Sequence, residues 1–222
     1  MSKIIRGLLF LFILKPFMYI VFGLRIFNYH KLPIGKQSII IANHSSHIDT
    51  LCILSIFPLS DVLKIHPIAA ADYFFTNKIK SFLMKNIIGA VPIVRKRKKT
   101  TETENANKLN VFENVEKVLE KGDSIILFPE GTRSVDSDIH EFKNGIAILA
   151  KKYPNIPITP LYISGADKIL PKNDFLFVPY VIEINVGDVQ YYNDQAMSSR
   201  EFSNKLYETV KSLRNELEEW NK

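Results

Sequence analysis

The chain has 222 residues, 46% of them hydrophobic and 23% charged, which is the composition of a folded protein and not of a disordered one. Lysine and arginine total 29 against 23 acidic residues, so the net charge of +6 favours an anionic partner: nucleic acid, a membrane surface or a phosphate-bearing substrate. The single cysteine, Cys52, excludes an intramolecular disulfide and a four-cysteine metal site, and its apolar neighbours indicate a small buried side chain.

Residues 4–27 form a strongly apolar segment. A signal peptide is not favoured, because Lys15, Pro16 and Phe17 follow the first apolar run where small residues would be needed. Lys15 and Pro16 divide the segment into halves, each about 12 Å long as a helix against a hydrocarbon core of about 30 Å. We therefore predict two short helices that dip into one leaflet, with a kinked span or a helix packed on the domain as alternatives. Five cations around the segment suit an anionic cytoplasmic leaflet: Arg6, Lys15, Arg25, Lys31 and Lys36.

Beyond this segment, predicted strands alternate with predicted helices. The strands are expected at residues 38–42, 65–71, 124–128, 158–163 and 175–186. The helices are expected at residues 48–57, 77–86, 101–120, 142–152 and from 198 onward. Pro160 and Pro179 predict bulges or edge positions in their strands. The alternation is typical of an α/β fold with a mixed, largely parallel sheet flanked by helices. We expect residues 1–30 to be membrane-docking helices and residues 31–222 a single α/β domain.

The first candidate for chemistry is the segment Asn-His-Ser-Ser-His-Ile-Asp at residues 43–49, between a strand and a helix. If Ser45 or Ser46 caps the helix, Asp49 falls in its first turn and can point back at the imidazole of His44. The carboxylate would then fix the histidine tautomer and stabilise its protonated form, as a general base requires. Alternatively, Asp49 complements the helix dipole and His44 bonds a carbonyl, or the histidines and Asp49 bind a metal, although no second cluster completes a shell.

The second candidate is the segment Phe-Pro-Glu-Gly-Thr-Arg-Ser at residues 128–134, at the carboxyl end of a strand, where α/β folds bind ligands. Gly131 lets the backbone turn and approach a ligand. The planar fork of Arg133 matches phosphate oxygens in a two-point contact that lysine does not copy. Glu130 is placed to orient Arg133 or to bind a hydroxyl. The plainer alternative is a loop with a surface ion pair.

A third patch, residues 89–95, leads into the basic run of residues 96–99. One interpretation assigns Arg95 to a ligand phosphate and the run to lipid headgroups; for the run itself we prefer a solvated stretch before a helix. No aromatic residues interleave with these cations and no nucleic-acid motif is present, so we do not expect a nucleic-acid partner.

In order and spacing, these motifs resemble those of the glycerolipid acyltransferases, in particular the bacterial 1-acyl-glycerol-3-phosphate acyltransferases that make phosphatidic acid. The likeness runs from about residue 39 to residue 165. The family's Asn-His-x-Ser-x-x-Asp motif is matched by Asn43, His44, Ser46 and Asp49. Its Phe-Pro-Glu-Gly-Thr-Arg-Ser motif is matched in full, and residues 156–160, with their two prolines, resemble its fourth motif.

The family's second motif is matched less well. Gly89 and Arg95 are in place, but Val94 stands where an aspartate is common. Residues 70–74, Ala-Ala-Asp-Tyr-Phe, replace the motif's upstream Lys-x-x-Leu element. Because this motif helps to hold the acceptor, the departure bears on which acceptor is used more than on the reaction.

The resemblance implies direct acyl transfer, with no metal and no cofactor besides the donor, acyl-CoA or acyl-carrier protein. His44 would deprotonate the free hydroxyl of a lysophospholipid, with Asp49 orienting it, and the hydroxyl would attack the thioester carbonyl. A thiolate with a pKa of about 8.5 leaves with little acid help. A covalent acyl-serine is not needed, and the chain has no Gly-x-Ser-x-Gly elbow.

The resemblance also assigns the phosphate site. Arg133 and Arg95 would hold the acceptor phosphate, with Glu130 and Thr132 shaping the pocket. Backbone amides near Gly131 are a candidate oxyanion hole.

We therefore expect an enzyme on the cytoplasmic face of the cell inner membrane that acylates lysophosphatidic acid. The near alternative is the same chemistry on a lyso-ornithine lipid, a glycolipid or another lysophospholipid. Two alternatives of other classes are a lipid esterase, in which His44 and Asp49 activate water or a serine, and a catalytically silent membrane-binding module.

Overall fold

The computed structural model describes residues 3–71, 77–93, 112–134, 138–169, 180–193 and 196–220. The strands are β1 (Arg25–Phe27), β2 (Ile39–Ala42), β3 (Ile65–Ala70), β4 (Val91–Ile93), β5 (Ser124–Leu127), β6 (Ile158–Ser164) and β7 (Glu183–Val186). They form one sheet in the spatial order β1-β7-β6-β2-β5-β3-β4. Neighbouring strands are parallel except β6 and β7, so the mixed, largely parallel sheet predicted from the sequence is confirmed.

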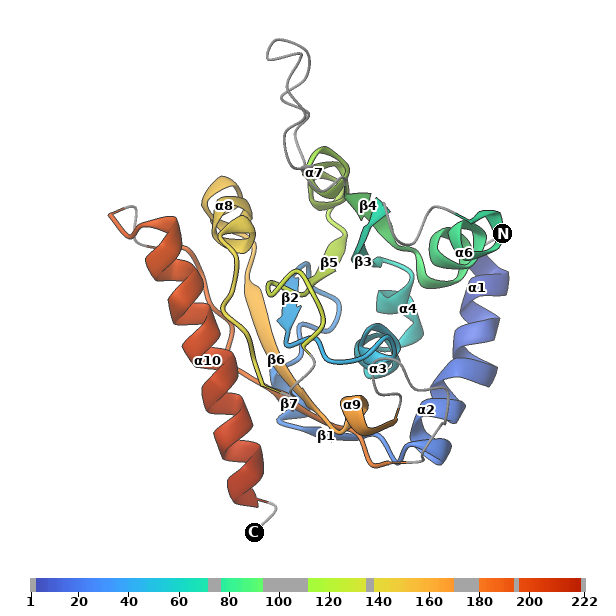
Figure 1. Cartoon of the computed structure of the whole chain (residues 1–222). Helices are drawn as coiled ribbons and strands as arrows, with labels where there is room; N and C mark the ends of the chain where they lie inside the picture. The colour runs from blue at the N-terminus through green and yellow to red at the C-terminus, as the bar shows by residue number, and fades with distance from the viewer. Residues whose placement is uncertain are drawn as a thin grey trace.

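Helices cover both faces of this sheet (Figure 1). The amino-terminal helix consists of α1 (Lys3–Leu9), the π-helical η1 (Phe10–Leu14) and α2 (Lys15–Val21). The shorter helices are the 3-10 turn η2 (Tyr29–Lys31), α3 (Asp49–Ser55), α4 (Leu59–Val62), α6 (Lys78–Leu83), the π-helical η3 (Met84–Ile88) and α9 (Ala166–Ile169). The remaining helices are α7 (Glu113–Glu120), α8 (Gly145–Lys152) and α10 (Ser199–Trp220).

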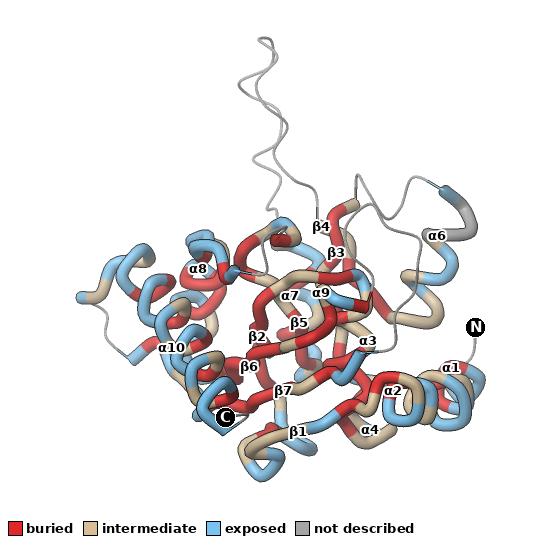
Figure 2. Tube along the Cα trace, turned by 60° about the horizontal axis from the view of Figure 1, so that its bottom comes forward, coloured by how far each residue is buried: buried red, intermediate tan, exposed pale blue. Residues whose placement is uncertain are grey.

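The isoleucine run of β2 shows why the sheet is buried on both faces. Ile40 packs in the core that lies under α2, α3, α4 and α9, whereas Ile39 and Ile41 pack in the core under α7, α8 and α10. Successive side chains of a strand point to opposite faces, so a strand covered on both sides is apolar at every position. Figure 2 shows the result: the central strands β2 and β6 are almost wholly buried, the edge strand β1 is half-buried or exposed, and the helices are exposed on their outer sides.

The amino-terminal helix corrects one expectation. Its backbone is helical on both sides of Lys15 and Pro16, with no break between two halves. The N–H of Lys15 bonds to the carbonyl of Phe10, five residues earlier. This wider π-helical turn accommodates the proline that follows it. Ile4–Val21 is long and apolar enough, by length and composition alone, to cross a membrane, with a mean hydropathy of 2.0 and 22% of the stretch buried.

Pro160 corrects a second expectation, because it lies in β6, an interior strand, and not at an edge of the sheet. Its missing N–H causes no conflict, since the ladder between β6 and β7 begins only at Leu161. The carbonyl of Pro160 still accepts the N–H of Gly187 at 2.9 Å. Pro179, Val94, Arg95 and the predicted helix start at residue 101 lie outside the described residues.

The carboxy-terminal helix begins as its sequence predicts. The N–H of Ser198 donates to Glu201 Oε2 at 2.8 Å, and the N–H of Glu201 donates to Ser198 Oγ at 3.2 Å. These reciprocal bonds form a capping box. One face of α10 is buried against β6 and α8, through Phe202, Leu206, Val210, Leu213 and Leu217.

Candidate active site

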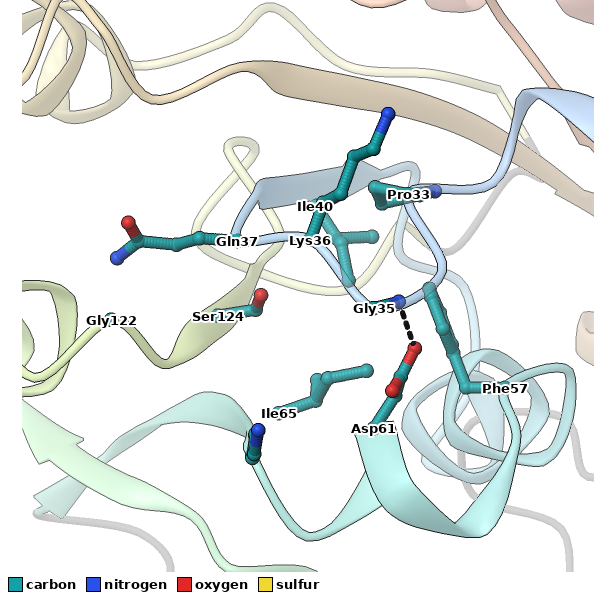
Figure 3. Close-up of a pocket in the computed structure, with 11 residues that line it drawn as sticks. Pro33, Gly35, Lys36, Gln37, Ile40, Phe57, Asp61, Ile65, Gly122 and Ser124 are labelled. Atoms are coloured by element: carbon teal, nitrogen blue, oxygen red, sulfur yellow. Dashed lines mark hydrogen bonds between the residues drawn. The ribbon is translucent and has the colours of Figure 1, made fainter.

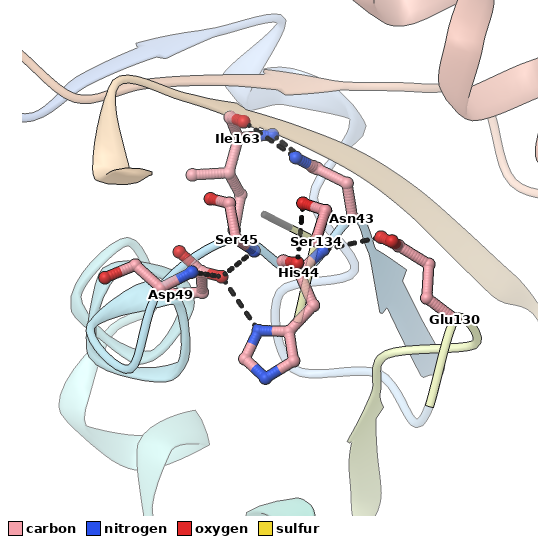
Figure 4. Close-up of polar contacts among 8 residues, drawn as sticks. Asn43, His44, Ser45, Asp49, Glu130, Ser134 and Ile163 are labelled. Carbon is pink, nitrogen blue, oxygen red and sulfur yellow. Dashed lines mark hydrogen bonds and ion pairs between the residues drawn. The ribbon is translucent and has the colours of Figure 1, made fainter. Parts of the chain in front are cut away.

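The site is built around His44, in the loop that joins β2 to α3 at the carboxyl ends of the parallel strands. His44 Nδ1 lies 2.8 Å from Asp49 Oδ2, and Asp49 is fully buried (Figure 4). Because a carboxylate only accepts, Nδ1 is the donor, and Nε2 of the neutral ring keeps its lone pair. The structure therefore brings the two residues together in the geometry of a base and its orienting carboxylate.

The helix start differs from the expectation that a serine caps α3. Asp49 is itself the first residue of α3, and the N-cap residue is Ile48, whose side chain makes no capping hydrogen bond. Asp49 Oδ2 instead accepts the N–H groups of Ser45 and Ser46, each at 2.8 Å. One carboxylate oxygen thus holds both the imidazole and the backbone of the loop that carries it.

Glu130 joins the two motifs. It is 3% exposed, and its two oxygens accept the N–H of His44 at 2.7 Å and the N–H of His140 at 3.2 Å. Burial raises the pKa of Glu130, and the two N–H bonds partly offset this effect. No hydrogen bond or ion pair joins Glu130 to Arg133 among the described residues. In this structure Glu130 therefore positions the backbone of His44.

Two further polar residues hold the same loop. Ser134 donates from its N–H and its hydroxyl to the carbonyl of His44, at 2.9 and 3.2 Å. Asn43 donates to the carbonyl of Ile163 at 2.9 Å and accepts the N–H of Ile163 at 2.8 Å, so its side chain prolongs the ladder between β2 and β6. The backbone around His44 is thus fixed on both sides.

The remaining predicted residues are placed less centrally. Gly131 has φ +72, and its N–H donates to the carbonyl of Phe128 at 3.0 Å, so this amide is engaged within the turn. Thr132 is exposed, and Arg133 is half-buried. Within the described part of the chain, Arg133 has no hydrogen-bond or ion-pair partner. Arg95 lies outside the described residues, so its assignment stays a prediction.

Two cavities flank the imidazole, and His44, Ile68, Ala69 and Phe128 line both. The first, called the α6 cavity, has a volume of about 340 Å³ and is bounded by α3, β3, α6 and η3. Its side chains are mainly apolar and include Leu51, Leu83, Met84 and Ile88. The second, called the α8 cavity, has a volume of about 460 Å³ and extends to Gly131, Lys143, Gly145 and Ile146.

Lys143 is a candidate that the sequence analysis missed. A Cβ on Gly131 would lie 2.6 Å from Lys143 Nζ, so the ammonium group lies directly over this glycine and lines the α8 cavity. No described residue pairs with that ammonium group. The sequence predicts a helix over residues 142–152, which includes Lys143, but α8 starts only at Gly145. The N–H of Lys143 bonds to the carbonyl of Pro129 at 2.9 Å, which fixes it beside the second motif.

A smaller pocket of about 60 Å³ lies at the opposite ends of the strands (Figure 3). It is lined by residues that precede or begin β2, β3 and β5, among them Gly35, Ile65 and Ser124. The N–H of Gly35 donates to Asp61 Oδ2 across this pocket at 2.7 Å. His44 is not among its lining residues, so this pocket is separate from the candidate active site.

Comparison with known proteins agrees with the geometry. Residues 23–164 match the family model described as Acyltransferase. A 1-acyl-sn-glycerol-3-phosphate acyltransferase of Brassica napus (BAT2, chloroplastic) is 26% identical over 59% of this chain and 34% of its own length. A probable enzyme of the same name from Mycoplasma genitalium is 30% identical over 59% of this chain and 45% of its own length. Tafazzin of Drosophila melanogaster is 27% identical over 85% of this chain and 52% of its own length.

The chain thus aligns with about a third to a half of the length of these curated relatives. Among solved structures, the 1-acyl-sn-glycerophosphate acyltransferase PlsC of Thermotoga maritima has the same fold, with a TM-score of 0.70 over 92% of this chain and 78% of its own. Its sequence identity is 21%, so that likeness speaks for the fold alone. Because the family model covers more than half of the residues, the chain belongs to the acyltransferase family.

Proposed function

We propose that the protein is a membrane-associated O-acyltransferase that converts 1-acyl-glycerol-3-phosphate into phosphatidic acid, with acyl-CoA or acyl-carrier protein as donor. The observation that carries the proposal is the position of His44 where the two cavities meet, with Asp49 bonded to Nδ1. The names of the curated relatives support this substrate. We infer no metal or further cofactor.

The chemistry follows from Nε2 of His44. This nitrogen takes the proton of the acceptor hydroxyl as the oxygen attacks the thioester carbonyl, and the imidazolium is stabilised by Asp49. As the tetrahedral intermediate collapses, the carbon–sulfur bond breaks and the thiolate takes the proton back from Nε2. The products are the acylated acceptor and the free thiol of the donor.

Each of the two cavities takes a part of one substrate in this proposal. The α6 cavity is lined mainly by apolar side chains and fits the acyl chain of the donor. The α8 cavity carries the ammonium group of Lys143 and fits the phosphate of the acceptor, with Arg133 and Arg95 as the further cations expected from the motifs. The thioester carbonyl and the acceptor hydroxyl then meet at His44.

The outer side of the amino-terminal helix is the membrane-docking surface of this proposal. Its exposed apolar side chains are Ile4, Ile5, Leu8, Leu11, Phe12, Ile13, Phe17, Tyr19 and Ile20. A contiguous apolar surface of this kind marks a membrane or protein contact. We place it on the cytoplasmic face of the inner membrane, where the soluble acyl donors are available.

The cations expected to face the lipid are in part used by the protein itself. Arg6 and Lys15 donate to backbone carbonyls, and Lys31 pairs with Asp188 at 2.9 Å. Arg25 is exposed but lies 3.6 Å from Glu183 Oε1, and Lys36 is exposed. Apolar burial therefore contributes more to the proposed docking than the charge pattern suggested.

Acyl transfer by the purified protein in mixed micelles tests the function. Labelled acyl-CoA or acyl-carrier protein is offered with a panel of lysolipids to the wild type, to His44→Ala and to His30→Ala, a control at an exposed histidine outside the site. We expect phosphatidic acid from the wild type and from His30→Ala but not from His44→Ala. Another acylated lipid would shift the proposal to the alternative acceptor. Free fatty acid alone would indicate the esterase, and no product with either donor would contradict acyl transfer.

A further inference from the structure

Arg6 is a cation in an otherwise apolar stretch of α1, and it is 8% exposed. Its guanidinium points into the protein. Nε donates to the carbonyl of Ile87 at 2.9 Å, and Nη2 donates to the carbonyls of Ile88 at 2.8 Å and Val62 at 3.2 Å. One side chain of the amino-terminal helix thus bonds to the ends of both α4 and η3.

These carbonyls are groups that need an external partner. The last carbonyls of a helix have no N–H partner within it and carry the negative end of the helix dipole. The planar fork of Arg6 meets two consecutive carbonyls of η3 from two different nitrogens, a fixed geometry that the single nitrogen of lysine does not reproduce. Arg6 therefore fixes where η3 ends relative to α1.

Gly89 is adapted to this contact. It ends η3 with φ +76, which favours glycine, and a Cβ there would lie 2.5 Å from Arg6 Nη2. The carbonyl of Gly89 accepts a bond from His66 Nδ1 of β3 at 3.0 Å. The backbone at the end of η3 is thus held from one side by Arg6 and from the other by the sheet.

The same turn of chain is a wall of the α6 cavity. Leu83, Met84 and Ile88 line that cavity together with His44 and Leu51. Since η3 is a π-helix, its backbone is not fixed by ordinary α-helical bonds, and such segments are frequent at functional sites. Arg6 therefore bonds to the carboxyl end of a segment that lines the cavity.

We infer that Arg6 is a positioning residue that sets the η3 wall of the α6 cavity and thereby the acyl-chain length that the enzyme selects. The inference rests on the proposed function, in which this cavity takes the acyl chain. It also couples the helix that docks on the membrane to the choice of acyl group. A donor too long for the cavity would have to displace η3, which the three hydrogen bonds of Arg6 oppose.

The test compares kcat/KM for a series of saturated acyl-CoA donors of increasing length. The variants are Arg6→Met, Arg6→Lys and Lys15→Met, a control on the same amino-terminal helix whose ammonium bonds to the carbonyl of Phe57 away from η3. In Arg6→Met, the ratio of kcat/KM for the best donor to kcat/KM for a donor longer by two methylenes should fall about tenfold. A fixed apolar pocket supplies discrimination of about this size between chain lengths. Arg6→Lys should lose part of this preference, and Lys15→Met should keep it.

A purely structural role would lower kcat/KM by the same factor for every donor and leave the length profile unchanged. An unchanged length profile in both Arg6 variants would overturn the inference. If Arg6→Met does not fold, the length profile of Arg6→Lys alone serves as the test. Leu83→Trp is a second probe, expected to shift the preference to shorter donors. An unshifted profile in Leu83→Trp would place the chain outside the α6 cavity and overturn the inference while acyl transfer stands. A wild type that transfers no acyl group would refute the proposed function itself.

Discussion

The imidazole of His44 stacks on the ring of Phe128, with the ring centroids 4.1 Å apart and the planes inclined by 15°. Phe128 follows β5 at the start of the second motif, whereas Asp49, which holds Nδ1, belongs to the first. The stack restrains the plane of the imidazole, and the carboxylate restrains its rotation within that plane. The two motifs together hold one ring before a substrate is present, which is what preorganised base catalysis requires.

Asp49→Asn tests this arrangement. An amide oxygen still accepts from Nδ1 but stabilises the imidazolium poorly, so kcat should fall about 10²- to 10⁴-fold. The variant should also lose stability, by about 1–3 kcal/mol, because Asp49 Oδ1 is buried without a partner and the new NH₂ group would be unsatisfied there. Kinetics and thermal melting measure the two effects. Asp61→Asn, outside the site, is the control and should keep its kcat, and normal turnover by Asp49→Asn would show that the pair is not catalytic.

Lys143→Met tests the phosphate site. Removing a charge-assisted bond to phosphate should raise the KM for lysophosphatidic acid about tenfold or more, with a much smaller change in the KM for the acyl donor. Lys151→Met removes an exposed cation of α8 and should alter neither constant. Equal changes for acceptor and donor would remove Lys143 from the phosphate site.

Glu130→Gln tests the buried carboxyl through pH. Burial raises the pKa of Glu130, so the folded state binds its proton more tightly than the unfolded chain does. The free energy of unfolding of the wild type, relative to Glu130→Gln, should therefore fall as pH rises from about 4.3, the ordinary glutamate pKa, through the raised value. Urea unfolding across this window measures the difference.

Glu201→Gln is the matched control, because it should show the opposite slope. The hydrogen bonds to Ser198 in the capping box lower the pKa of Glu201. The wild type should therefore have a higher free energy of unfolding than this variant above the ordinary glutamate pKa. This difference is lost as pH falls through the lowered pKa of Glu201. The free energy of unfolding of the wild type relative to Glu201→Gln should rise with pH. If the free energy of unfolding relative to Glu130→Gln also rose with pH, that result would contradict the argument that burial raises the pKa of Glu130.

Membrane docking is tested at the outer side of the amino-terminal helix. Phe12 and Ile20 are 68% and 81% exposed, and changing both to serine should weaken binding to anionic vesicles about tenfold or more, since burying each contributes about 1.5–3 kcal/mol. Co-sedimentation with vesicles measures the binding. The double change of Ile148 and Val189 to serine, at exposed apolar positions elsewhere, should leave it unaltered. Equal losses in both double variants would show that the helix is not the docking surface.

Much of this site was predictable because its parts are close in sequence. His44 and Asp49 lie five residues apart, and the run of isoleucines before them predicts the strand that precedes the loop. Arg6 and Lys143 were not predictable in their observed roles. Arg6 bonds to carbonyls 56 to 82 residues away, so nothing near it in sequence distinguishes it from a cation facing lipid. The position of Lys143 depends on where α8 begins, and tertiary context routinely overrides the local propensities from which a helix start is predicted.

The pairing of β1 with β7 has a practical consequence for producing the protein. The apolar helix ends at Val21, and the edge strand of the sheet, β1, begins soon after it at Arg25. A truncation that removes this strand with the helix would bare the backbone N–H and C=O groups of β7 and invite aggregation between exposed edges. Solubilising the protein thus calls for redesigning the outward side chains of the helix while keeping residues 25–27 in place.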